Sequence, residues 1–259
     1  MAMGTDMVMV MEMRRKSNLF THFLQKRPIR NFDLLEDMTD VHSHYLSGVD
    51  DGMNTFDETL DSLSKMLEHR VKNIYFTPHV MTDYSVNTPF FLKKKFEEFK
   101  EQMPLDVNIR LAAEYMFDAS FSNHMDDELL TMTNGYVLVE MSYFSASPEL
   151  NNFIYQLQLK NYKPILAHPE RYMFMEKEDY KTLKARNVKF QMNLLSLSGV
   201  YGRRVYDVAW YLLQEKMYDF CGTDIHNYDF FSKKMMTFKL TNKEFSLVKT
   251  LIAKNEHLW

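Results

Sequence analysis

The sequence predicts an α/β fold, and in its most specific form a distorted TIM-like (β/α)7 barrel. From residue 37 onward, seven short apolar runs alternate with longer amphipathic runs. Strands that alternate with helices are typical of a parallel sheet. Seven such units in a chain of 259 residues favour a barrel, because barrels of this kind run to about 250 residues as one domain. No Pro/Gly/Ser-rich linker divides the units, so we expect one domain over residues 37–259.

The elements are placed from their apolar patterns and from helix start signals. The predicted strands cover residues 38–41, 73–77, 107–113, 136–139, 164–167, 188–192 and 218–221. The predicted helices cover residues 55–70, 89–103, 150–160, 180–186, 204–216 and 241–254. Thr55 is a candidate N-cap for the first helix. The apolar residues of that helix recur at spacings of four, three and four, which is one buried face: Phe56, Leu60, Leu63 and Leu67.

Composition excludes several classes of protein. The formal net charge is −4, and no basic run is longer than Lys93–Lys95, so we expect no nucleic-acid partner. No apolar stretch reaches the ~18 residues of a membrane span, which predicts no stable membrane insertion. The single cysteine, Cys221, cannot form an intrachain disulfide, and we interpret it as a buried strand residue. We expect a cytoplasmic protein.

Residues 1–36 carry little structural information. Six of the 21 methionines lie within the first 13 residues. Asp6 and Glu12 interrupt the apolar run there, which is unlike a secretory signal. We therefore expect residues 1–36 to be a flexible N-terminal extension.

Polar residues with metal-binding side chains follow six of the seven predicted strands. These residues are His42, His79, Glu114, Glu140, His168 and Asp224. In a barrel of this kind, the carboxyl ends of the strands meet on one face, and catalytic residues lie there. The sequence therefore predicts that these six side chains converge.

Three further residues extend this set of candidate ligands. His44 follows His42 at i+2, His226 follows Asp224 in the same way, and Asp51 lies in the first loop. Four carboxylates in one pocket would repel each other unless positive charge lay among them. Imidazole and carboxylate ligands together suit Zn, Fe or Mn. Five histidines and four carboxylates exceed the needs of one ion, so we expect two or three divalent ions.

The order of these motifs resembles that of the PHP (polymerase and histidinol phosphatase) superfamily. The motifs are His42-Ser43-His44, Thr77-Pro78-His79, Glu114, Glu140, His168-Pro169-Glu170-Arg171 and Gly222-Thr223-Asp224-Ile225-His226. The stretches HSHYLSGVDDG, ILAHPERY and QMNLLSLSGVYG more narrowly resemble the capsule-locus tyrosine phosphatases of bacteria. The resemblance runs from about residue 37 to residue 230, and the first 36 residues lie outside it.

This resemblance implies a PHP-type phosphatase domain, usually activated by manganese, on a distorted barrel. The implied substrate is the phosphorylated tyrosine cluster on the tail of a bacterial tyrosine kinase that controls exopolysaccharide chain length. All nine metal-ligand positions of the family hold an acceptable residue here. The family often has an arginine shortly after the final DxH motif, where this chain has residues 227–231, and Lys233 is the nearest cation.

The implied mechanism is attack on phosphorus by a metal-activated hydroxide. Arg171, three residues after His168, is the natural bidentate clamp for the phosphate. A tyrosine leaving group has a pKa near ~10 and needs only modest protonation. Either Asp51 or His226 could supply that proton.

Two other functions use the same residues. One is a phosphatase or phosphodiesterase for a small metabolite, such as histidinol phosphate. The other is a catalytically silent module that binds the kinase tail, although the complete set of ligand residues favours catalysis. Five aromatic residues either wall a pocket for a phenyl ring or belong to the core: Tyr84, Phe90, Phe117, Tyr143 and Phe144.

Overall fold

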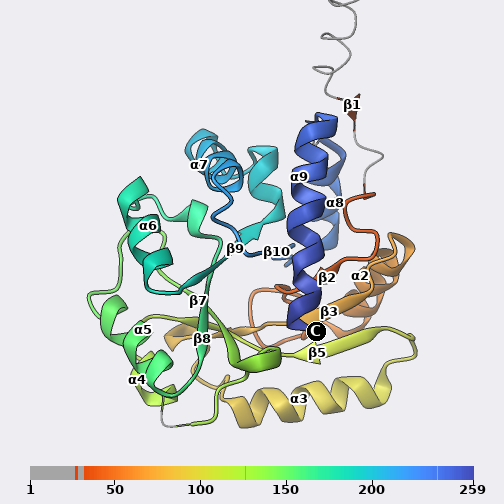
Figure 1. The fold of residues 1–259 in the computed structure, drawn as a ribbon. Coiled ribbons are helices and arrows are strands. Elements are labelled where there is room, and N and C mark those ends of the chain that lie inside the picture. Colours follow the sequence, from red (N-terminus) through yellow and green to blue (C-terminus); the bar gives the residue numbers. More distant parts are fainter. Residues whose placement is uncertain (1–26, 29–31, 126, 238) are drawn as a thin grey trace, which may run out of the picture.

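The computed structural model describes residues 27–28, 32–125, 127–237 and 239–259 (Figure 1). The helices are α2 (Phe56–Glu68), α3 (Pro89–Gln102), α4 (Phe121–His124), α5 (Leu150–Leu159), α6 (Lys177–Ala185), α7 (Arg203–Gln214), α8 (Tyr228–Thr237) and α9 (Asn242–Ala253). Short 3-10 turns cover Thr82–Tyr84, Thr133–Gly135, Pro169–Arg171, Leu194–Ser198 and Lys254–Leu258. Within the described residues, no helix has the length and apolar character that a membrane span requires.

The described strands form two parallel sheets and one short antiparallel pair. They are β1 (Arg27–Pro28), β2 (Thr39–Asp40), β3 (Asn73–Phe76), β4 (His79–Val80), β5 (Asn108–Leu111), β6 (Glu114–Met116), β7 (Tyr136–Glu140), β8 (Lys163–Ala167), β9 (Lys189–Asn193), β10 (Phe220–Gly222) and β11 (Lys239–Leu240). The larger sheet has the order β10-β9-β8-β7-β6-β4, and the smaller has the order β2-β3-β5. The antiparallel pair joins β1 to β11.

Each of the seven predicted strands overlaps a strand of these parallel sheets, but two predicted runs continue into a second strand. The run at 73–77 is followed by β4, and the run at 107–113 is followed by β6. Pro78 separates β3 from β4 because proline has no N–H to give to the ladder. The Pro78 carbonyl still accepts a hydrogen bond from the backbone N–H of Glu114 at 3.1 Å. The two sheets therefore continue into each other across these breaks.

Buried polar contacts link β2 to β10, the first and last strands of the parallel set. The Asp40 carboxylate accepts hydrogen bonds from the Thr223 backbone at 3.0 Å and from its hydroxyl at 2.5 Å. The Asn255 amide donates to the carbonyls of Thr39 and Cys221, at 2.7 and 2.6 Å. Cys221 is fully buried in β10, which confirms its interpretation as a strand residue.

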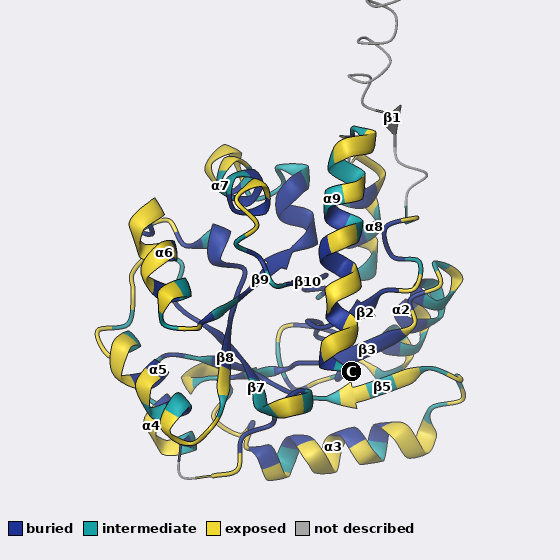
Figure 2. Ribbon diagram, viewed as in Figure 1, coloured by how far each residue is buried: buried dark blue, intermediate teal, exposed yellow. Residues whose placement is uncertain are grey.

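The core lies between the strands and the surrounding helices. In Figure 2 the strands β7 to β10 are buried, whereas helices such as α3 alternate between a buried and an exposed face. Leu34 and Leu35, which lie within the predicted extension, are fully buried in the core. The prediction of a flexible segment is therefore wrong for this part, because two leucines pack there. Residues 1–26 and 29–31 of the predicted extension lie outside the described residues.

Two helix predictions need correction. The first turn of α6 begins at Lys177, earlier than the predicted start at Tyr180. Glu176 and Asp179 form a reciprocal capping box there, which is the local signal for the earlier start. Helix α8 (Tyr228–Thr237) was not predicted, although its buried Phe231 and Met235 lie at a helical spacing of four.

Candidate metal centre

The nine predicted ligands come together at the carboxyl ends of the parallel strands. His42 and His44 follow β2, Asp51 lies in the next loop, and Asp224 and His226 follow β10. The remaining four ligands belong to or follow β4, β6, β7 and β8: His79, Glu114, Glu140 and His168. His79 and Glu114 begin strands of their own, which corrects the expectation that they follow strands directly. They still lie side by side, because β4 and β6 pair in parallel with His79 opposite Glu114.

Within the described residues, the ligand atoms form three overlapping groups, and in each the atoms lie within 4.8 Å of one another. The groups are His44, Asp51, His79 and His226; His42, His44, Glu114 and Asp224; and His79, Glu114 and Glu140. His168 joins them through its Nε2 atom, which lies 3.1 Å from Oε1 of Glu114. Every group shares a residue with another group. The arrangement therefore suits several adjacent cations better than one.

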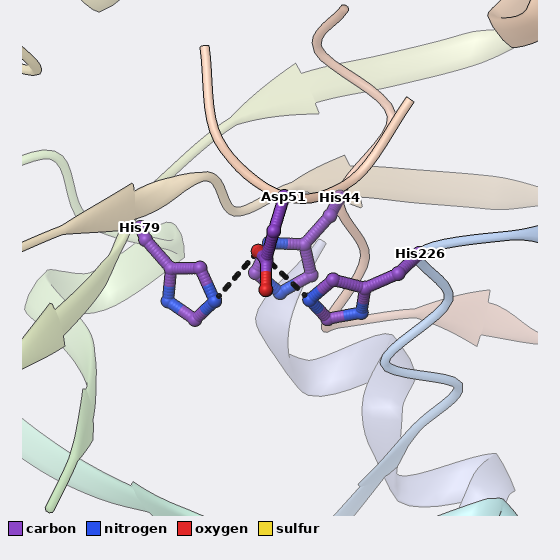
Figure 3. A group of neighbouring side chains, drawn as sticks. All are labelled: His44, Asp51, His79 and His226. Carbon is purple, nitrogen blue, oxygen red and sulfur yellow. Dashed lines mark ion pairs between the residues drawn. The ribbon is translucent and has the colours of Figure 1, made fainter. Parts of the chain in front are cut away.

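Figure 3 shows the most exposed of the three groups. The Asp51 carboxylate lies between two imidazoles, 3.4 Å from Nε2 of His79 and 3.3 Å from Nε2 of His226. The rings of His44 and His226 stack with their centroids 3.9 Å apart. Hydrogen bonds from His226 and His79 lower the pKa of Asp51. Asp51 therefore stays ionised and supplies negative charge at the open side of the cluster.

The buried part of the cluster has the chemistry of a cation site. Nδ1 of His79 and Oε1 of Glu140 lie 2.9 Å apart, yet neither has a hydrogen-bond partner among the described residues. Burial opposes the charged form of His79, but contacts with Asp51, Glu140 and Glu114 raise its pKa to about 10. The carboxylates thus favour positive charge at this site. A divalent cation would supply such charge, and its binding would release protons from the imidazoles.

Two residues outside the predicted set orient the imidazole ligands. Nδ1 of His44 donates to the buried Asp50 carboxylate at 2.8 Å, and Nδ1 of His42 donates to Oε1 of Gln191 at 2.9 Å. Asp50 also accepts from the backbone N–H of His79 at 3.1 Å. Such partners fix which ring nitrogen faces the metal. The acidic pair in VDDG was the signal for Asp50, whereas Gln191 opens the stretch QMNLLSLSGVYG but had no role assigned from the sequence.

Asp224 links the cluster to Arg171 because its two oxygens face different partners. Oδ1 lies 3.3 Å from Nε2 of His42 and 3.4 Å from Nε2 of His44. Oδ2 accepts hydrogen bonds from Nη1 of Arg171 and from Nδ2 of Asn193, both at 2.8 Å. The backbone of Asp224 is left-handed, with φ of 52°, a conformation that costs free energy in a residue other than glycine and often marks functional sites.

Two glycines allow the backbone to approach the histidines closely. A Cβ atom on Gly222 would lie 2.5 Å from Cβ of His42, and one on Gly52 would lie 2.2 Å from the carbonyl oxygen of His44. Both contacts are shorter than atoms tolerate. The glycines of the GTD and DDG motifs are therefore required by packing around the ligands.

The cluster opens into a cavity of about 550 Å³. Its lining includes seven predicted site residues: Asp51, His79, Glu114, His168, Arg171, Asp224 and His226. The other lining residues are Tyr143, Leu195, Tyr201, Ile225, Asn227, Phe230 and Phe231. Of the five aromatic residues singled out in the sequence, Tyr143 lines the cavity and Phe117 is buried in the core. Lys233 is exposed on α8 and is not part of the lining.

A parallel α/β fold with clustered imidazoles and carboxylates at one cavity is typical of metal-dependent hydrolases. The chain belongs to the family described as "Capsular polysaccharide synthesis, CpsB/CapC", which matches residues 38–254. This match confirms the predicted family.

Named relatives and a solved structure agree with this assignment. Tyrosine-protein phosphatase YwqE of Bacillus subtilis is 25% identical over 73% of this chain and 78% of its own. Tyrosine-protein phosphatase CpsB of Streptococcus agalactiae is 22% identical over 74% of this chain and 84% of its own. A crystal structure from a study of YwqE and Streptococcus pneumoniae CpsB, "unique metal-dependent tyrosine phosphatases", superposes with a TM-score of 0.71. It is 22% identical, covers 85% of this chain and 94% of its own, and supports the fold.

Proposed function

We propose that this chain is a metal-dependent protein-tyrosine phosphatase. Its substrate is phosphotyrosine on a bacterial tyrosine kinase that regulates capsule or exopolysaccharide synthesis. The observation that carries this proposal is one cluster of nine candidate metal-ligand side chains, six of which line a cavity of about 550 Å³ together with Arg171. The names of the relatives support the reaction class. The kinase-tail substrate and the cytoplasmic location stay predictions.

The three groups of ligand atoms hold two or three divalent ions in this proposal, and Mn²⁺ is the resident metal. The donor set supports such ions because it combines imidazoles with carboxylates. The buried contact of 2.9 Å between Nδ1 of His79 and Oε1 of Glu140, neither of which has a hydrogen-bond partner among the described residues, also supports it. When bound, the ions activate water for attack on phosphorus and neutralise the charge on the phosphoryl oxygens.

The chain's own residues bind and orient the substrate. Arg171 lies in the cavity wall and binds the phosphate through its planar set of N–H donors. Asp224 holds this guanidinium next to the ligand cluster by a hydrogen bond of 2.8 Å. Asp51 and His226 both line the cavity. The ionised Asp51 carboxylate has no proton to give, so in this proposal His226 gives the proton that the leaving tyrosine oxygen takes up.

The finer form of the fold is also a proposal: the two sheets close into a distorted (β/α)7 barrel. A parallel bridge between Ser43 and Ile225, on the segments that follow β2 and β10, supports this closure. The backbone N–H of Asp224 also donates to the His42 carbonyl at 2.8 Å. We propose a phosphatase domain that covers the family match and the buried leucines before it.

The test is release of phosphate from a phosphotyrosine peptide by metal-stripped protein, with and without added Mn²⁺. We expect activity with Mn²⁺, and its loss in the Arg171→Ala and His42→Ala variants. Arg203→Ala and His257→Ala are matched controls, because both residues are exposed and neither lines the cavity. Full activity without metal, or an active His42→Ala variant, would contradict the proposal. Activity on small phosphomonoesters and none on the peptide would favour the metabolite phosphatase instead.

A further inference from the structure

Arg171 lies against two aromatic rings from different segments of the chain. Its guanidinium carbon is 4.5 Å from the ring centroid of Tyr143 and 4.5 Å from that of Tyr201. Tyr143 comes from the loop after β7, and Tyr201 comes from the SGVYG turn before α7. Both rings line the cavity. A guanidinium at this distance from a ring is attracted by the ring's negative face.

Hydrogen bonds to the turn around Arg171 hold its backbone in place. Glu170, the preceding residue, is buried and accepts three hydrogen bonds: from the Asn193 backbone at 2.9 Å, from the Ser196 hydroxyl at 2.7 Å and from the Tyr218 hydroxyl at 2.9 Å. The Arg171 N–H donates to the His168 carbonyl at 2.9 Å. The turn is therefore fixed to the ends of neighbouring strands. The conformational freedom that remains to Arg171 is in its long side chain.

The contacts of the guanidinium leave its donors available. Among the described residues, the Asp224 carboxylate is the one hydrogen-bond acceptor that Arg171 uses, and a guanidinium has five N–H donors. The two rings restrict the side chain without using these donors. A long, rotamer-rich side chain that is already restricted loses less entropy when it binds a ligand.

We propose that Tyr143 and Tyr201 are positioning residues: their rings hold the Arg171 guanidinium in the orientation that binds the phosphate. This inference rests on the proposed phosphatase function. The rings act through Arg171 and have no chemical role of their own. Their hydroxyl groups are dispensable. The Tyr201 hydroxyl has one long contact, 3.4 Å from Nδ2 of Asn193.

The first test is binding of inorganic phosphate to Mn²⁺-loaded protein, measured by calorimetry. We expect Tyr143→Leu and Tyr201→Leu to weaken binding about tenfold, the scale of a partly desolvated cation–π contact. Tyr143→Phe and Tyr201→Phe keep the ring and should change binding by less than about threefold. Tyr211→Leu is the matched control, because its ring also lies 4.5 Å from a cation, Lys177, but outside the cavity.

The second test is a double-mutant cycle with Arg171→Ala. If the rings act through Arg171, Tyr201→Leu should have no further effect on phosphate binding in the Arg171→Ala background. In the single variants, KM for a phosphotyrosine peptide should rise, and rescue by phenylalanine should be nearly complete. A persistent effect in the Arg171→Ala background would overturn the proposal and point to direct contact between the rings and the substrate. Loss of binding in the phenylalanine variants would overturn it as well.

The phosphate-binding test also separates this inference from the proposed function. If the protein binds inorganic phosphate with the predicted dependence on the two rings but does not hydrolyse phosphotyrosine, the positioning role stands and the proposed reaction is contradicted. If the variant with leucine at positions 143 and 201 hydrolyses phosphotyrosine with the kcat and KM of the wild type, the proposed reaction stands and the positioning role is contradicted.

Discussion

Two histidines with stacked rings in this molecule have pKa values shifted in opposite directions. His44 stacks on His226 at 3.9 Å inside the cluster of candidate ligands, and His69 stacks on Phe32 at 3.6 Å, where neither ring lines the cavity. Burial opposes the charge on both rings. Contacts with Asp50, Asp224 and Glu114 nevertheless raise the pKa of His44 well above its usual value, whereas burial lowers the pKa of His69. The neighbours of the ring therefore distinguish a histidine of the candidate ligand cluster from a packing histidine.

The largest expected effect comes from removing a carboxylate that contacts the clustered histidines. Glu114→Gln removes the carboxylate that contacts His42, His44 and His168. We expect the bound metal per chain to fall and phosphatase activity to drop at least about 100-fold, because Glu114 belongs to two of the three candidate ligand groups and the variant would lose its charge there. Elemental analysis and an activity assay measure the two effects.

Glu170→Gln is the control for that experiment. Glu170 is an equally buried glutamate, but it accepts hydrogen bonds from a backbone N–H and two hydroxyls and does not contact the ligand imidazoles. It should keep its metal content. Equal metal loss in both variants would mean that general disruption of the fold explains the result.

A smaller effect is expected when the partner of His44 is changed. Asp50→Asn keeps the shape of the side chain but removes the charge that faces Nδ1 at 2.8 Å. Loss of such a partner typically costs 10- to 100-fold in metal affinity, and we expect about that loss in competition with a chelator. Asp83→Asn changes an exposed acid nearby and should leave the affinity unchanged. An unchanged affinity in Asp50→Asn would contradict the role assigned to Asp50.

A still smaller effect tests the packing histidine. Because the pKa of His69 is lowered in the folded state, the unfolded chain binds more protons between the two pKa values. His69 therefore contributes stability above its ordinary pKa, and this contribution is lost as the pH falls through the folded value. Chemical unfolding at pH 7 and pH 5 should show a steeper loss for the wild type than for His69→Gln. A loss of the same size in both would contradict this account.

The smallest expected effect concerns the cation beyond the last ligand motif. Lys233→Ala should change KM for a phosphotyrosine peptide by less than about twofold, because Lys233 is exposed and Phe230 and Phe231 occupy the cavity wall instead. Steady-state kinetics measure this change. A large rise in KM would show that Lys233 reaches the phosphate as the family's second arginine would.

The sequence predicted the strands and the convergence of the candidate ligands, because apolar runs and the residues that follow them are local signals. Five of the nine histidines lie at the predicted strand ends, and that rule set His44 apart from His69 without any structure. The break at Pro78 could be predicted because proline interrupts a strand. The pairing of β4 with β6 could not, because it depends on the register between segments that are distant in sequence.

The supporting contacts could not be predicted in the same way. Gln191 and Tyr201 have ordinary residue types and become informative only because the fold brings them to His42 and Arg171. Helix α8 was missed although Asn227 marks its start: the Oδ1 atom of Asn227 accepts a hydrogen bond from the backbone N–H of Phe230 at 2.9 Å, as an N-cap does. Side-chain partners that are distant in sequence leave no local pattern.

The link between Asp40 and Thr223 has a consequence for the order of events during synthesis. These residues are 183 positions apart, and the ligands beside them, His42 and Asp224, are separated by almost the same length of chain. A chain still being made has the first two histidines long before it has the last two ligands. The complete cluster of candidate ligands therefore assembles only after most of the domain has been made.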